Sequence, residues 1–112
     1  MGLDTTHDCW SGPYSSFNRF REAIAFHLGF RLRDMEGFGG STRWSTLPPD
    51  PLHVLLNHSD CDGTIEVKDL LPLAERLEAI APSIMSQHAA EALRFARGLR
   101  EAAVLQQPVE FQ

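Results

Sequence analysis

The chain has 112 residues, a length that suits one domain and is short for two. Lys and Arg number 10 against 15 Asp and Glu, and the resulting net charge of -5 argues against binding to duplex nucleic acid. No apolar run approaches a membrane span, the first residues lack the features of a signal peptide, and two cysteines make no disulfide framework. We therefore expect a cytoplasmic protein without a membrane partner.

Hydrophobic periodicity predicts a mainly helical protein. Apolar side chains recur at steps of three and four, which places them on one face of a helix. A nearly continuous apolar run in the middle of the chain indicates a further, central helix. The four predicted helices cover residues 13–28, 50–58, 66–81 and 83–104.

Local signals suggest where these helices begin. Ser11 and Ser83 suit the caps of the first and last helix, because a serine hydroxyl accepts a hydrogen bond from a free backbone N–H. Asp50 suits the cap of the second helix for the same reason. Pro72 should lie in the first turn of the third helix, where its missing N–H costs nothing.

The remaining segments complete the predicted fold. Residues 36–49 are rich in glycine and proline and predict a mobile loop. Short β segments are expected near the N-terminus, at residue 65 and at the C-terminus, where Val109 and Phe111 alternate with Glu110. The fold class is thus one mainly α domain, spanning residues 1–112, with about four helices and short β segments.

The segment 58–69, between the second and third helices, resembles the calcium-binding loop of an EF-hand. Gly63 stands at position six, where the loop turns sharply, and Ile65 follows at position eight. Calcium is the expected cofactor, with zinc as the alternative, and no organic cofactor is implied. The candidate metal ligands are His58, Asp60, Asp62 and Asp69 through their side chains and Thr64 through its carbonyl.

Two positions depart from the EF-hand pattern. Position one is His58 instead of an aspartate, and its nitrogen suits zinc better than calcium. Position twelve is Asp69 instead of a longer, bidentate glutamate. Both changes should weaken calcium binding. An alternative interpretation is a plain Asp62-Gly63 turn that binds no metal.

Cysteine and histidine offer a different kind of site. Folded together, the pairs His7/Cys9 and His58/Cys61 could offer zinc two nitrogens and two sulfurs. The possible accessory site comprises His7, Cys9, Trp10 and Cys61. A small metal- or Cys/His-dependent hydrolase, with His7, His58, Cys61 and Asp62 in one pocket, is a further alternative. The stretch 60–65 also resembles the DxDGT motif of haloacid-dehalogenase-like phosphatases, but no alternating strand–helix pattern surrounds it. We assign no catalytic residue and expect a binding protein rather than an enzyme.

A basic surface is the other candidate. Arg19 and Arg21 on the first helix, with Arg43 and Trp44 in the 36–49 loop, are the predicted partner-binding residues. In this alternative the protein inhibits a host or defence protein through that helix and that loop. A host or phage protein, or a small molecule, is the expected partner.

Two strings in the sequence carry a resemblance to a family. The opening MGLDTTH with Trp10, and the central HSDCDG at residues 58–63, resemble a family of small uncharacterised bacteriophage and prophage proteins. The resemblance implies a phage-type accessory protein that works by binding in the bacterial cytoplasm. We further expect a Leu3–Thr5 strand to pair beside Ile65, in place of a second EF-hand loop. This pairing would bring His7 and Trp10 near His58 and Asp62.

Overall fold

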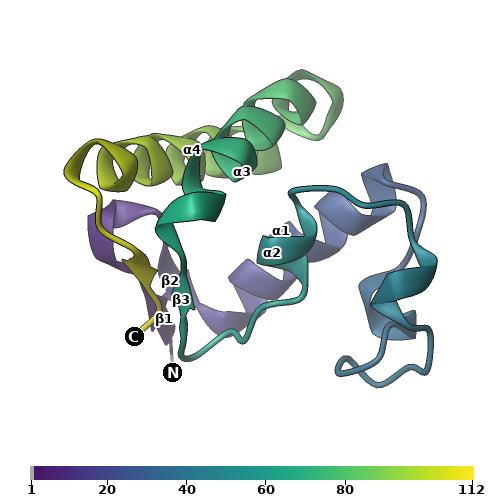
Figure 1. The fold of residues 1–112 in the computed structure, drawn as a ribbon. Helices are drawn as coiled ribbons and strands as arrows, with labels where there is room; N and C mark the ends of the chain where they lie inside the picture. Colours follow the sequence, from purple (N-terminus) through teal and green to yellow (C-terminus); the bar gives the residue numbers. More distant parts are fainter. Residues whose placement is uncertain (1) are drawn as a thin grey trace.

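A computed structural model describes residues 2–112. Two long helices, α3 (Val67–Ile80) and α4 (Ser86–Leu105), pack as an antiparallel pair joined by a short 3-10 turn, η4 (Ala81–Ser83). Helix α1 (Tyr14–His27) and the short α2 (His53–Leu56) lie beneath this pair (Figure 1). The prediction of a mainly α fold with four helices is therefore confirmed.

Two small antiparallel sheets complete the fold. Their strands are β1 (Gly2–Asp4) with β2 (Ser11–Pro13), and β3 (Thr64–Ile65) with β4 (Val109–Glu110). A bridge between Thr5 and Phe111 connects the two sheets. The backbones of Asp4 and Gln112 also exchange hydrogen bonds, at 3.3 and 2.8 Å, so the first and last described residues lie side by side (Figure 1).

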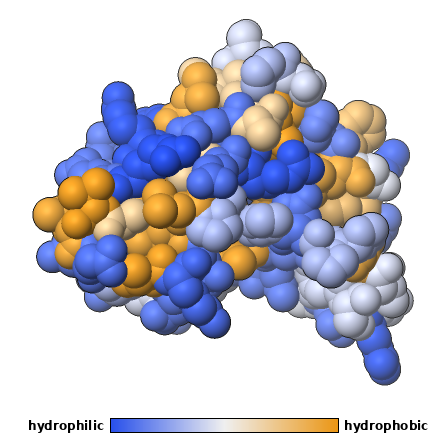
Figure 2. Space-filling model, turned by 45° about the horizontal axis from the view of Figure 1, so that its top comes forward, coloured by the Kyte–Doolittle hydropathy of each residue, from blue (hydrophilic) through white to orange (hydrophobic). Residues whose placement is uncertain are grey.

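One apolar cluster draws side chains from all four helices. At its centre Trp10 lies 5.2 Å from both the Phe17 and the Phe20 ring, measured between centroids. Helix α4 approaches the N-terminal turn closely at Gly98, where an added Cβ would lie 2.5 Å from the Cys9 sulfur. A larger residue does not fit there without displacing the turn. Hydrophobic side chains also reach the surface at both ends of the α3–α4 layer (Figure 2).

Helix α2 is much shorter than the predicted helix 50–58. Its cap position is Leu52 and not the predicted Asp50, whose side chain accepts a hydrogen bond of 2.9 Å from the Leu52 N–H in the turn before the helix. The helix ends at Leu56, however, and Asn57 leaves the helical region with φ -96° and ψ 34°. The carbonyls of Leu56 and His58 turn towards the Arg21 guanidinium, and this contact draws the chain out of the helix.

Three predicted helix starts are also corrected. Ser11 lies in β2, and Ser83 lies in η4, three residues before α4 begins. Helix α3 begins at Val67, so Pro72 is its sixth residue and lies beyond the first turn. Pro72 and Lys68 are both exposed, so water can reach the Lys68 carbonyl that the proline leaves without a backbone partner.

The N-terminal strand pairs differently from the prediction. Leu3 lies opposite Gly12 in a local hairpin, and β4 takes the place beside Ile65 that was expected for residues 3–5. The hairpin closes a short loop, which costs less chain entropy than a distant pairing. Gly2 makes the close approach possible, because a Cβ there would lie 2.9 Å from the Gly12 carbonyl oxygen.

The segment between α1 and α2 holds two short 3-10 turns, η2 (Leu32–Asp34) and η3 (Trp44–Thr46). Within it, the Glu36 N–H donates to the Thr42 carbonyl at 2.9 Å, and the Trp44 indole donates to the Glu36 carbonyl at 3.2 Å. The predicted loop 36–49 is thus irregular but closed on itself by hydrogen bonds. Within residues 2–112, no helix is both long enough and apolar enough to cross a membrane.

Candidate functional site

Loop 58–69 shares several local backbone features with an EF-hand loop. Helix α2 precedes it, and α3 starts at Val67, which is position ten. Gly63 has a φ of 90°, the left-handed conformation that the sharp turn at position six requires. Ile65 is fully buried in β3 and pairs with Val109. The structure therefore contains these three features of an EF-hand loop: the turn at Gly63, the buried Ile65 and a helix that begins at position ten.

The His58 imidazole lies inside this frame. Its Nε2 is 3.0 Å from the Thr64 carbonyl oxygen, and its Nδ1 is 2.7 Å from the Ser59 carbonyl oxygen. A neutral imidazole donates to only one of these oxygens, whereas an imidazolium donates to both. The Phe111 ring covers His58 with a centroid distance of 4.0 Å. The carbonyl predicted to bind a metal thus lies within hydrogen-bonding distance of a side chain of the same loop.

The acidic residues of the loop do not converge on one point. Asp62 is exposed, Asp60 borders a cavity described below, and Asp69 lies in the first turn of α3. Among the described residues, no group of three or more His, Cys, Asp and Glu side chains is placed to hold a metal ion. Calcium or zinc binding by loop 58–69 stays a prediction, and it requires the imidazole to leave the Thr64 carbonyl.

The histidine and cysteine candidates lie in different surroundings. Cys9 is buried beside Gly98 of α4, and this burial raises the pKa of its thiol to about 12. Such a thiol is protonated at neutral pH and is a poor nucleophile or metal ligand. The His7 carbonyl faces the same part of α4, and Trp10 belongs to the aromatic core. Cys61 is exposed on loop 58–69, and both cysteines are free thiols.

Arg21 lies in the interior, although the sequence placed it on a partner-binding surface. It is 2% exposed, and its Nη1 donates to the His58 carbonyl at 2.5 Å. The guanidinium carbon lies 4.7 Å from the centroid of the Phe17 ring and 5.2 Å from that of Phe38, so the cation sits between two aromatic faces. Burial lowers the pKa of the Arg21 guanidinium, and the nearby Asp60 carboxylate opposes this shift.

An open cavity of about 640 Å³ borders Arg21, and we call it the Arg21 cavity. Its walls come from the start of α1, the turn at residues 37–38 and the beginning of loop 58–69. The hydrolase alternative is only partly represented here, since His58 lines the cavity and His7, Cys61 and Asp62 do not. The lining residues are Tyr14, Ser15, Asn18, Arg21, Gly37, Phe38, Asn57, His58, Ser59 and Asp60.

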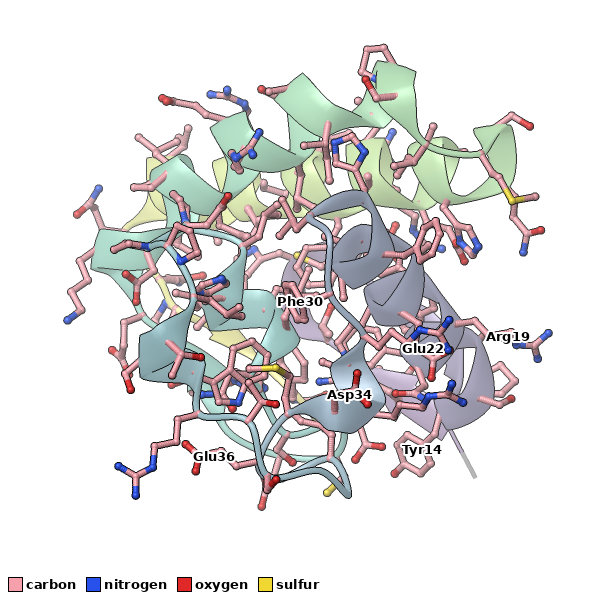
Figure 3. All side chains as sticks on the ribbon, turned by 90° about the vertical axis from the view of Figure 1, so that its right-hand side faces the viewer. Tyr14, Arg19, Glu22, Phe30, Asp34 and Glu36 are labelled. Atoms are coloured by element: carbon pink, nitrogen blue, oxygen red, sulfur yellow. The ribbon has the colours of Figure 1, made fainter. Side chains whose placement is uncertain are left out.

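A second concave region of about 780 Å³, which we call the groove, lies between α1 and the start of α4. One face of α1 forms a wall, residues 30–33 border it, and residues 83–85 with His88 form the opposite wall. Phe26 is 74% exposed and Met85 is 72% exposed. Figure 3 views this side of the molecule and shows Arg19 and Glu22 extending from α1. Arg31 and Arg33 also line the groove.

The other predicted partner-binding residues have different environments. Trp44 packs with its ring centroid 5.9 Å from that of Phe30 and 5.6 Å from that of His53, so its indole covers the segment after α1. Arg43 is exposed just before η3. Sequence reasoning identified Arg19 but missed Phe26 and Met85. The signal for Phe26 was an apolar residue beside charged residues on its helix, whereas Met85 lies just before α4 and had no such signal.

Comparison of the chain with family models, with curated proteins and with solved structures finds no match in any of the three sets. The resemblance to phage proteins therefore stays a prediction. The three regions of the molecule with chemistry suited to a ligand or partner are loop 58–69, the Arg21 cavity and the groove.

Proposed function

We propose that this protein is a binding protein whose groove docks an acidic, amphipathic helix of a partner protein. The observation that carries the proposal is the exposure of Phe26 and Met85 on the groove between α1 and the start of α4. An amphipathic helix that lays its apolar face into such a groove is a common mode of protein recognition.

The apolar side chains of the groove supply the expected binding energy. Phe26 and Met85 contribute side chains to opposite walls, and the partly buried Ile84 and Phe30 lie between the exposed pair and the core. Aromatic side chains at the centre of an interface often dominate its affinity. Methionine adapts its shape to a partner because its side chain is unbranched and flexible. Phe26 is therefore the expected anchor.

The charge of the groove selects an acidic partner. Arg19, Arg31 and Arg33 line it with one acidic residue, Glu22, so its formal charge is positive. The whole chain, by contrast, carries a net charge of -5. A basic concave surface on an acidic protein attracts acidic segments and repels basic ones. This contrast favours a helix with glutamate or aspartate beside its apolar face.

The proposal is tested with a fluorescein-labelled designed peptide that forms a helix with leucines on one face and glutamates beside them. Binding is followed by fluorescence anisotropy. We expect saturable binding that weakens at least tenfold, about 1.4 kcal/mol, in Phe26→Ser. Arg31→Glu should weaken binding and reduce its dependence on salt concentration.

Matched variants separate the groove from the rest of the surface. Val104, which is 83% exposed, provides the control Val104→Ser, and the exposed Arg97 on α4 provides Arg97→Glu. Neither residue lines the groove, so both controls should bind the peptide like the parent protein. Equal binding of a scrambled peptide, equal losses in the controls, or no binding at millimolar concentration would overturn the proposal.

Divalent-cation binding by loop 58–69 is a second candidate function, which the helix–loop–helix frame around Gly63 favours. In a phage-type accessory protein, such a cation would stiffen the loop between α2 and α3. The His58 side chain decides whether this happens, because it occupies the inside of the frame. Substitution of His58, described in the Discussion, is the direct test.

A further inference from the structure

The Arg21 cavity contains a buried cation whose hydrogen-bonding capacity is only partly used. The Nη1 of Arg21 donates to the carbonyls of His58 and Leu56, at 2.5 and 3.5 Å. Its Nε is buried and has no hydrogen-bond partner. Within residues 2–112, no carboxylate lies within ion-pair distance of this guanidinium. A buried donor without a partner costs stability, so the site favours a ligand that supplies an acceptor.

The edge of the guanidinium that has no hydrogen-bond partner among the described residues suits one planar oxyanion. Because Nη1 is already engaged by backbone carbonyls, Nε and Nη2 form the remaining pair of donors. Two parallel donors of this kind match the two oxygens of a carboxylate. The Phe17 and Phe38 rings lie against the guanidinium, with centroids 4.7 and 5.2 Å from its carbon, and this packing restricts its movement.

Asp60 determines which anion fits. It lines the same cavity as Arg21 but forms no ion pair with it. A phosphate group, with two negative charges near neutral pH, would be repelled by this carboxylate. A molecule with one carboxylate and one ammonium group instead satisfies both charges. Tyr14 and Phe38 add aromatic surface to the walls, and a cavity of about 640 Å³ has the size of a small-molecule site.

We propose that the Arg21 cavity binds a free amino acid, with its carboxylate on Arg21 and its ammonium group on Asp60. Asn18, Asn57 and the Ser15 hydroxyl also line the cavity and offer polar groups to the same ligand. This site is separate from the groove, since the two share no lining residue. The inference therefore does not depend on the proposed docking of a helix.

The test is an NMR titration of the ¹⁵N-labelled full chain with L-phenylalanine. We expect saturable shifts at residues 14–21, 37–38 and 57–60, the segments around the cavity. N-acetyl-L-phenylalanine lacks the ammonium group, and L-phenylalanine amide lacks the carboxylate. Each should bind at least tenfold more weakly, because each leaves one charge of the cavity without a partner.

Variants complete the test. Asp60→Asn should weaken L-phenylalanine binding at least tenfold, whereas Asp62→Asn, an exposed carboxylate outside the cavity, should leave it unchanged. Arg21→Lys keeps the charge but loses the paired donors, and it should bind more weakly if it folds. The inference is wrong if Asp60→Asn binds like the parent protein or if the capped derivatives bind as well as L-phenylalanine. It is also wrong if inorganic phosphate causes the shifts while L-phenylalanine does not.

Discussion

In loop 58–69 the histidine side chain contacts carbonyls of its own loop, whereas in the groove apolar side chains are exposed to solvent. His58 reaches two carbonyls of its own loop, and Phe111 covers its ring. In the groove, Phe26 and Met85 are more than 70% exposed and lie beside charged arginines. The two regions therefore differ in what they leave free for another molecule.

The comparison shows that a recognisable sequence motif, here in loop 58–69, need not coincide with the surface that is available for binding, here the groove. The HSDCDG string is the most conspicuous pattern in the sequence, yet its histidine is engaged within the fold. The groove has no motif, yet it exposes the Phe26 ring of α1 together with positive charge. Residues that bind one another contribute to stability, and exposed ones remain available for a partner. Stability measurements and binding measurements should therefore respond to different residues.

The largest expected contrast compares two phenylalanines. Phe111 is 5% exposed and packs against both His58 and Phe17, so Phe111→Ala should lower the free energy of unfolding by about 3–5 kcal/mol. Phe26→Ala removes an exposed ring and should change it by no more than about 0.5 kcal/mol. Urea denaturation of both variants measures the difference. If Phe26→Ala lowered the free energy of unfolding by several kcal/mol, the Phe26 ring would be part of the core. It would then not be available to bind a partner.

The second prediction opens the loop to calcium. His58→Asp removes the imidazole from the Thr64 carbonyl and places a carboxylate at position one of the frame. At a calcium concentration one hundred times Kd, binding should add about 2.7 kcal/mol to the stability of this variant. Its Tm in calcium should therefore exceed its Tm in EDTA by several degrees. The parent protein should respond less, because its imidazole must first leave the loop.

The control for this experiment is His58→Asp combined with Asp62→Ala, which should lose the calcium response. An equal calcium response in the parent protein would show that the imidazole does not block the loop. A response of the parent protein to zinc alone would shift attention to its histidine and cysteine side chains. If His58→Asp does not respond at all, loop 58–69 is a structural turn that only resembles a cation site.

Local patterns in the sequence predicted much of the fold. The apolar spacing found α1, α3 and α4 to within a few residues, and the alternation of Val109 and Phe111 indicated the terminal strand. Helix α2 was predicted too long, because its end depends on Arg21, which contacts it from 35 residues earlier in the chain. The pairing of β3 with β4 was missed for a similar reason, because the sequence does not show which of two distant strands pairs with β3.

The environments of the candidate residues were harder to predict. Arg21 reads as a surface charge, and only the fold shows it between two aromatic rings. His58 reads as a metal ligand because the loop pattern assigns it to position one. Its hydrogen bond to Thr64 depends on the curvature that Gly63 gives the backbone. Residue type and spacing identify which groups are close together in the chain. Which of their hydrogen-bonding groups stay available for a ligand depends on packing.

The smallest predicted effect tests whether His58 and Gly63 truly depend on each other. Gly29 has a φ of 93° with no atom near its missing Cβ, whereas Gly63 has a φ of 90° with the His58 Cε1 at 3.3 Å from that position. Gly29→Ala should therefore cost about 1–2 kcal/mol from backbone strain alone. Gly63→Ala should cost about 1 kcal/mol more, because the imidazole must move.

The excess cost should disappear when both glycine variants are measured in a His58→Ala background, since the ring is then absent. Urea denaturation of the parent protein, the three single variants and the two double variants gives this coupling energy directly. A coupling near zero would mean that the imidazole already moves freely within loop 58–69. The contact between His58 and the Thr64 carbonyl would then be too weak to exclude a cation. Loop 58–69 and the groove would differ only in how exposed their side chains are.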